Sequence, residues 1–130
     1  MATLTVKDET MTGKVQSTLD LEFDLELLSI KDIIAARVQK EVDKYNRQMP
    51  EYFNGLVQPT EAESTLNGYK MKQRKQIDAE KQVYIALDAF QRNVFFVLVN
   101  DRQVESLDEE VLLSNTSSVS FIKLTPLVGG

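Results

Sequence analysis

The stretch LDLEFDLEL, residues 19–27, alternates strictly between an apolar and an acidic residue. Because successive side chains of a β-strand point to opposite faces, the pattern predicts an antiparallel strand with one face in a core and the other in water. Its four carboxylates could in principle attract a cation. A solvated strand face accounts for them without a metal site, which we do not expect.

A helix is predicted to follow this strand directly. Ser29–Asp32 (SIKD) has the form of a capping box, in which a serine hydroxyl and an acid three residues later satisfy each other's backbone amides. The helix should run to about Tyr45. Its apolar residues share one stripe, formed by Ile30, Ile33, Ile34, Val38, Val42 and Tyr45. The charged residues are expected to face water, namely Lys31, Arg37, Lys40, Glu41 and Lys44.

Short β-prone segments flank this pair. Residues 3–7 precede it, and VFFVLV (94–99), residues 102–104 and residues 119–124 follow it. The unbroken apolar run at 94–99 indicates burial on both faces or a central place in a sheet, whereas residues 107–113 resemble a turn. A helix packed across one face of a sheet would bury all the apolar faces, which predicts an α+β fold.

Residues 46–93 differ in character, because they mix turn formers with aromatic residues. We interpret them as a partly helical insertion, with a short helix after Thr60 (TEAE) and a second helix capped by Asp78 and running to about Arg92. Its apolar residues are expected to pin it to the rest of the chain, although an exposed partner-binding surface is an alternative. The basic run YKMKQRK, residues 69–75, favours a solvated helix start or an acidic protein partner over nucleic acid.

Composition excludes several chemistries. The chain of 130 residues has no cysteine and no histidine, which excludes disulfides, thiolate ligation and any Ser-His or Cys-His catalysis built from its own residues. Its net charge of −5 argues against nonspecific nucleic-acid binding. Neither a signal peptide nor a membrane span is evident, so a cytoplasmic protein is expected. Nothing in the pattern indicates an enzyme or a bound cofactor.

The chain ends in PLVGG, residues 126–130. Pro126 cannot donate to a sheet ladder, so residues 125–130 are predicted to leave the sheet as a flexible tail. Glycine has no side chain, and a Gly-Gly end can lie in a channel too narrow for other residues. A frayed terminus without a function is the simpler interpretation of the two glycines taken alone.

The C-terminal third resembles the ubiquitin-like β-grasp proteins. FVLVNDRQVESLDEEVLL (96–113) is similar to ubiquitin's third strand, turn, short fourth strand and following loop, and SVSFIKLTPLVGG (118–130) to its last strand and tail. The ending is closer still to bacterial sulfur carriers such as the small subunit of molybdopterin synthase. The resemblance implies one β-grasp domain over residues 1–130, a mixed sheet with a helix across one face, and an insertion at 46–93 between the first helix and the third strand that has no counterpart in the family.

The resemblance also implies a function. An ATP-dependent adenylating enzyme would activate the Gly130 carboxylate for conjugation to a target, with Pro126, Leu127, Val128 and Gly129 as the residues that it recognises in the tail. ATP would be used by that partner, and a conjugating enzyme or a peptidase would be a further partner. A sulfur carrier with a C-terminal thiocarboxylate is the first alternative. An interaction module that binds through the insertion and carries an accidental Gly-Gly is the second.

Overall fold

The alternating segment forms the second half of strand β2 (Val15–Phe23) in the computed structural model, which describes residues 2–116 and 118–123. β2 is antiparallel to β1 (Ala2–Glu9), with Leu21 opposite Leu4, and both leucines are buried. The prediction of one strand over 19–27 is wrong beyond Phe23. The chain bends there and begins again as β3 (Leu27–Ser29), so that Leu28, and not Leu25 or Leu27, reaches the core.

A five-stranded mixed sheet forms one layer of this α+β fold, in the order β2-β1-β9-β6-β7. β9 (Val119–Lys123) lies in the centre, parallel to β1 and antiparallel to β6 (Phe95–Val99), and β7 (Arg102–Gln103) pairs with β6. The central strand is therefore β9. For residues 94–99, the expectation of burial on both faces is wrong, because β6 buries only one face fully. β6 is nevertheless an interior strand, between β9 and β7, as the alternative expectation had it.

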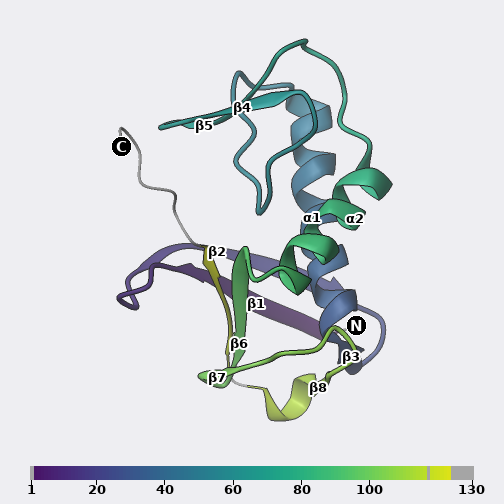
Figure 1. Ribbon diagram of the computed structural model, residues 1–130. Helices are drawn as coiled ribbons and strands as arrows, with labels where there is room; N and C mark the ends of the chain where they lie inside the picture. Colours follow the sequence, from purple (N-terminus) through teal and green to yellow (C-terminus); the bar gives the residue numbers. More distant parts are fainter. Residues whose placement is uncertain (1, 117, 124–130) are drawn as a thin grey trace.

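Two helices form the other layer. The capping box of α1 (Ile30–Gln48) is confirmed: Ser29 Oγ accepts a hydrogen bond from the Asp32 amide, and the Asp32 carboxylate accepts one from the Ser29 amide. The Asp78 cap of α2 (Ala79–Gln91) is confirmed too. Figure 1 shows α1 crossing one face of the sheet with α2 beside it.

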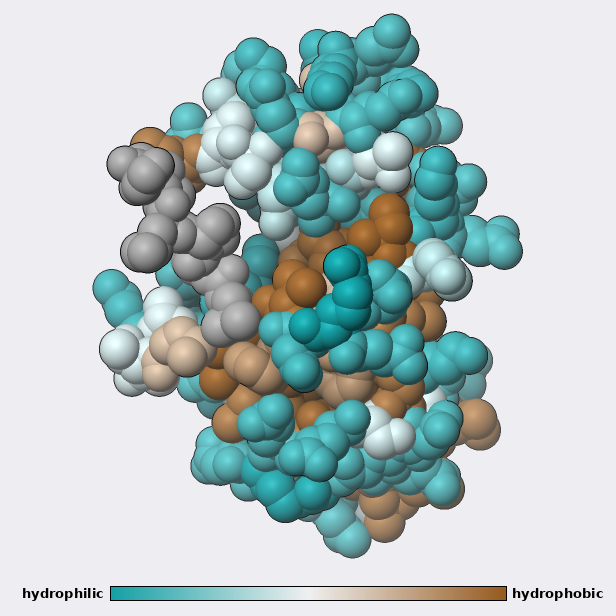
Figure 2. All heavy atoms as spheres, viewed as in Figure 1, coloured by the Kyte–Doolittle hydropathy of each residue, from teal (hydrophilic) through white to brown (hydrophobic). Residues whose placement is uncertain are grey.

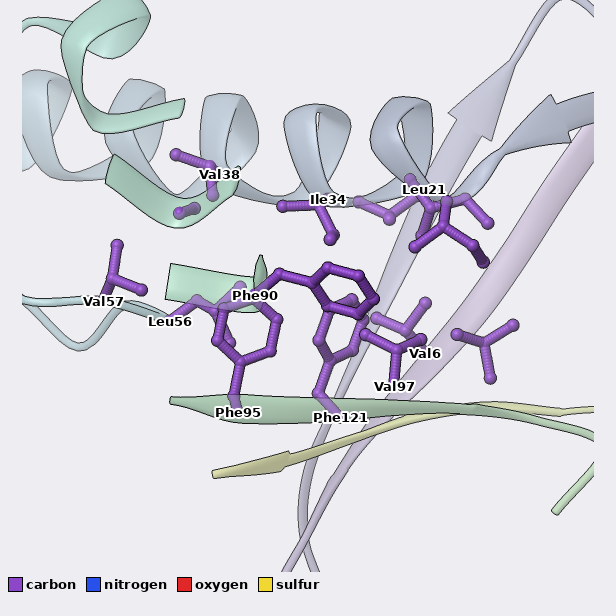
Figure 3. Close-up of a cluster of buried hydrophobic side chains, with 14 of the residues drawn as sticks. Val6, Leu21, Ile34, Val38, Leu56, Val57, Phe90, Phe95, Val97 and Phe121 are labelled. Carbon is purple, nitrogen blue, oxygen red and sulfur yellow. The ribbon is translucent and has the colours of Figure 1, made fainter. Parts of the chain in front are cut away.

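The core lies between these layers (Figure 3). Phe95, Val97 and Phe121 of the sheet face Ile34 and Val38 of α1 and Phe90 of α2. Leu56 and Val57 come from the loop after α1 and join the same cluster. This confirms that apolar residues of 46–93 pin that segment to the rest of the chain.

Residues 46–93, the predicted insertion, differ from their prediction in one part. TEAE does not begin a helix, because Glu61 takes a left-handed conformation (φ 62°) and the residues after it are extended. They form a hairpin of β4 (Ala62–Thr65) and β5 (Gly68–Met71), and a bridge between Phe53 and Tyr69 joins it to the preceding loop. The basic run at 69–75 accordingly starts in a strand and not in a helix.

A second small ribbon lies at the start of α1. β8 (Glu110–Leu112) pairs with β3 in antiparallel fashion, and a short 3₁₀ helix, η1 (Leu113–Asn115), follows it. The expected turn at 107–113 is thus partly a strand. Its pairing partner lies more than eighty residues earlier, so local sequence does not reveal it.

Candidate functional site at the end of the last strand

The predicted tail residues Pro126, Leu127, Val128, Gly129 and Gly130 lie outside the described residues. The structure instead shows the strand from which they follow. β9 ends at Lys123, after three consecutive buried residues, Val119 to Phe121. Because β1 and β6 pair with it on either side, the chain leading to the tail is held in the middle of the sheet.

Arg37 of α1 packs against this end of β9. It was predicted to face water, yet only 3% of the residue is exposed. Its Nη2 donates to Asp8 Oδ2 at 2.7 Å, while Nη1 donates to Asp8 Oδ1. Its guanidinium carbon also lies 4.6 Å from the centre of the Phe121 ring. A planar cation can satisfy a carboxylate and stack on an aromatic face at the same time, which a lysine cannot do as well.

Glu41 and Lys123, both partly buried, complete a charge cluster around the buried Arg37. Glu41 Oε2 lies 3.5 Å from Arg37 Nη2, and its other oxygen accepts a hydrogen bond from the Leu56 amide at 3.3 Å. Lys123 Nζ donates to the Gly55 carbonyl at 2.9 Å. The cluster, formed by Asp8, Arg37, Glu41 and Lys123, thus connects β1, α1, β9 and the loop that opens the insertion.

Burial sets the electrostatics of the cluster. Burial raises the pKa of Glu41, and the Arg37 charge offsets only part of that effect. Burial also lowers the pKa of Lys123, and the nearby Arg37 charge lowers it further. For Arg37, burial acts to lower the pKa, but the hydrogen bond to Asp8 and the charge of Glu41 outweigh it, so the pKa is raised.

The cluster can hold the end of β9 in place, but one of its hydrogen-bond donors has no partner. Arg37 Nε is buried and has no hydrogen-bond partner among the described residues. Buried polar groups are usually paired, so this atom marks incomplete compensation of the buried cation. The cluster was missed at the sequence level, although one signal existed: Arg37 and Glu41 are four residues apart and adjoin the apolar stripe of α1.

The other candidate features do not join this cluster. Within residues 2–116 and 118–123, no group of three or more acidic side chains is arranged to hold a metal ion. A groove of about 610 Å³ runs between β2 and α1, and no member of the cluster lines it. In the basic run, Lys75 pairs with Glu61 at 3.2 Å and Lys70 lies 3.9 Å from Glu51.

Comparisons with known proteins identify no relative of this chain. No protein-family model matches the chain, and no curated protein or solved structure is significantly similar to it. Among the described residues, neither helix has the length and apolar character needed to cross a membrane.

Proposed function

We propose that the chain is a ubiquitin-like β-grasp protein whose C-terminal carboxylate is activated for conjugation. The observation that carries the proposal is the sheet order, in which the last strand lies in the centre, parallel to the first strand and antiparallel to β6. Helix α1 follows the first hairpin and crosses the sheet (Figure 1), as in the family that the sequence resembles. Five residues, 124–128, separate the end of this central strand from the Gly-Gly end.

The proposed reaction uses the chain as a substrate. An oxygen of the Gly130 carboxylate attacks the α-phosphorus of ATP in an adenylating enzyme, and pyrophosphate leaves to give an acyl adenylate. A cysteine thiol of that enzyme then displaces AMP to form a thioester. Attack by a target amine forms an amide or isopeptide bond and releases the thiol. In this scheme Pro126, Leu127, Val128 and Gly129 seat the tail in the enzyme, and the sheet with α1 supplies the body that it binds.

Sulfur transfer is the second candidate, and the apolar LTPLVGG ending favours it. Sulfide would then attack the adenylate to give a thiocarboxylate at Gly130, and AMP would leave. An interaction module without tail chemistry remains the third candidate, for which the insertion would be the binding surface.

The test is an intact-mass measurement of the purified chain after incubation with ATP, sulfide and an adenylating enzyme from the same organism. A conjugate or an enzyme thioester is expected for a modifier, and exchange of one carboxylate oxygen for sulfur for a carrier. A chain that lacks Gly129 and Gly130 should unfold at the same urea concentration as the full chain and give neither product. If the full chain also gives neither, the proposed function is wrong.

A further inference from the structure

The ribbon of β3 and β8 carries an apolar pair on each face, and its third pair, Ser29 and Glu110, is polar. Leu28 and Val111 are paired across the ribbon and are 5% and 4% exposed, so they form its inner face. Leu27 and Leu112 are also paired across it, and they are 53% and 40% exposed. A ribbon with one face on a core normally carries polar residues on the other face. The core therefore explains the inner pair but not the outer one.

A third exposed leucine, Leu25, lies close to this outer pair in sequence. It precedes Leu27 by two residues and is 68% exposed. We name Leu25, Leu27 and Leu112 the leucine patch. Figure 2 shows hydrophobic atoms breaking the hydrophilic surface at the end of the molecule where β3 and β8 lie. The other strongly exposed apolar residues are distributed over several segments, namely Met11, Val15, Leu66, Tyr84 and Val94. Single exposed apolar residues are ordinary, whereas grouped ones mark binding surfaces.

The charges around the leucine patch are mainly acidic. Asp24 and Glu26 flank Leu25 in sequence, and Glu110 lies two residues before Leu112 on the same strand. All three are exposed, and none forms an ion pair within the part of the chain that the structure describes. Lys31, in the first turn of α1, is the nearest exposed cation along the chain from Leu27.

This charge decides between two kinds of occupant. A second copy related by twofold symmetry would bring the same patch against itself, which would place the acidic rims of the two copies side by side. Like charges brought together at an interface disfavour that pairing. A different protein with apolar side chains at its centre and lysine or arginine at its rim would bury the leucines and neutralise the carboxylates.

We propose that the leucine patch is a docking site for a partner protein that presents an apolar centre surrounded by basic residues. This interaction is separate from the proposed tail chemistry, because it needs neither Gly129 nor Gly130. It also differs from binding through the insertion, since β3 and β8 lie outside residues 46–93.

A random-peptide phage library selected on the full chain tests the proposal. Peptides that also bind the Leu27→Ser/Leu112→Ser double variant are removed from the selection. Both substitutions of this variant are on the solvent face and leave Leu28 and Val111 in place. Circular dichroism and urea unfolding verify that this variant is folded. Leu66→Ser, which replaces another exposed leucine at the β4–β5 turn, is the matched control.

The enriched peptides should combine apolar residues with lysine or arginine. Their dissociation constants should rise about tenfold or more for the double variant, stay unchanged for Leu66→Ser, and rise with salt. The proposal is overturned if no peptide survives depletion, if the survivors are acidic, or if Leu66→Ser weakens them equally. It is also overturned if sedimentation shows that the wild type dimerises through the patch, with the dimer lost in the double variant, because the occupant would then be a second copy.

Discussion

Arg37 shows how a single charged residue can be part of a core. Its burial costs solvation, and the cost is offset by the two hydrogen bonds to Asp8, by Glu41, and by stacking on Phe121. The same contacts connect α1 to the two parallel strands at the end from which the tail follows. Removing Arg37 leaves the Asp8 and Glu41 carboxylates, whose side chains are only 18% and 11% exposed, without their cation, which is more costly than removing an exposed ion pair.

Replacing Arg37 with methionine should therefore be strongly destabilising. Asp8 and Glu41 would lose their shared cation, and we expect a loss of about 3–5 kcal/mol in the free energy of unfolding, measured by urea denaturation. Lys44→Met, at an exposed position of the same helix, should change that free energy by less than about 0.5 kcal/mol. A small loss for Arg37→Met would mean that the cluster does not hold the strands to α1.

The raised pKa of Glu41 should make the free energy of unfolding depend on pH. Because burial raises its pKa in the folded state above the usual value of 4.5, the folded chain binds its proton more readily than the unfolded chain does. Its ionised form therefore costs stability above the raised pKa, and this cost disappears as the pH falls toward 4.5. Glu41→Gln lacks this dependence. The free energy of unfolding of the wild type, minus that of Glu41→Gln, should therefore increase as the pH falls from neutral.

Urea denaturation of the wild type and of Glu41→Gln, from neutral pH down to about 4.5, measures this difference. The contributions of the other acidic groups are common to both proteins and largely cancel. The exposed Glu63→Gln variant is the control for replacing a carboxylate with an amide, and its free energy of unfolding should differ from that of the wild type by less than about 0.5 kcal/mol. A Glu41→Gln difference that decreases on acidification would contradict the assignment of burial as the dominant effect on Glu41.

The side chain of Asn46, near the end of α1, bonds to the backbone just before α2. Its side chain donates to the Ile77 carbonyl at 2.9 Å and accepts from the Ile77 amide at 2.8 Å, just before the Asp78 cap of α2. Alanine at this position would leave both Ile77 backbone groups without a partner, and we expect a loss of about 1–3 kcal/mol.

Hydrogen exchange locates this effect. Amides in the first turns of α2 should exchange faster in Asn46→Ala than in the wild type, while those of β9 keep their protection. Asn67→Ala, at the exposed β4–β5 turn, should change neither region. Faster exchange throughout the sheet would show that Asn46 supports the whole fold and not the start of α2.

The elements that sequence predicted well have local signals. Ser29 and Asp78 predicted the starts of α1 and α2, because a helix cap depends on a few neighbouring residues. The strand that ends at Phe23 was predicted by its strict alternation. Leu25 and Leu27 continue the same alternation but lie outside the core, because the chain bends after Phe23. Where a strand ends and which strand it pairs with depend on distant segments, as β8 illustrates with its partner β3.

The candidate site was predictable only in part. The final strand was expected at residues 119–124 and occupies Val119–Lys123, whereas the role of Gly130 stays a prediction because the tail lies outside the described residues. The charge cluster escaped prediction because a charged residue at a helix surface is usually solvated. The packing of Phe121, the position of Asp8 on a neighbouring strand and the charge of Glu41 make the interior favourable for Arg37.

The core extends across the insertion, so residues 46–93 are not expected to be dispensable. Val38, Val42 and Tyr45 of α1 are at most 3% exposed, and they belong to one cluster with residues of the insertion. Tyr45 packs edge-on against Phe53, with ring centres 5.5 Å apart, and α2 lies along α1. Without residues 46–93, these three α1 side chains would be exposed, at a cost of about 1.5–3 kcal/mol each. The sum of these costs approaches the total stability of a typical domain, about 5–15 kcal/mol.

Replacing residues 46–93 with a short Gly-Ser linker should accordingly abolish cooperative unfolding, even though the five sheet strands remain. Replacing only residues 64–68, at the tip of the β4–β5 hairpin, with a two-residue turn should preserve it, because that change leaves Phe53, Leu56 and α2 in place. Thermal unfolding followed by circular dichroism distinguishes the two variants. If the long deletion still melted cooperatively near the wild-type temperature, the insertion would be an appendage, and the minimal sheet with α1 would be stable alone. We expect the opposite, because the buried face of α1 is covered by the sheet on one side and by the insertion on the other.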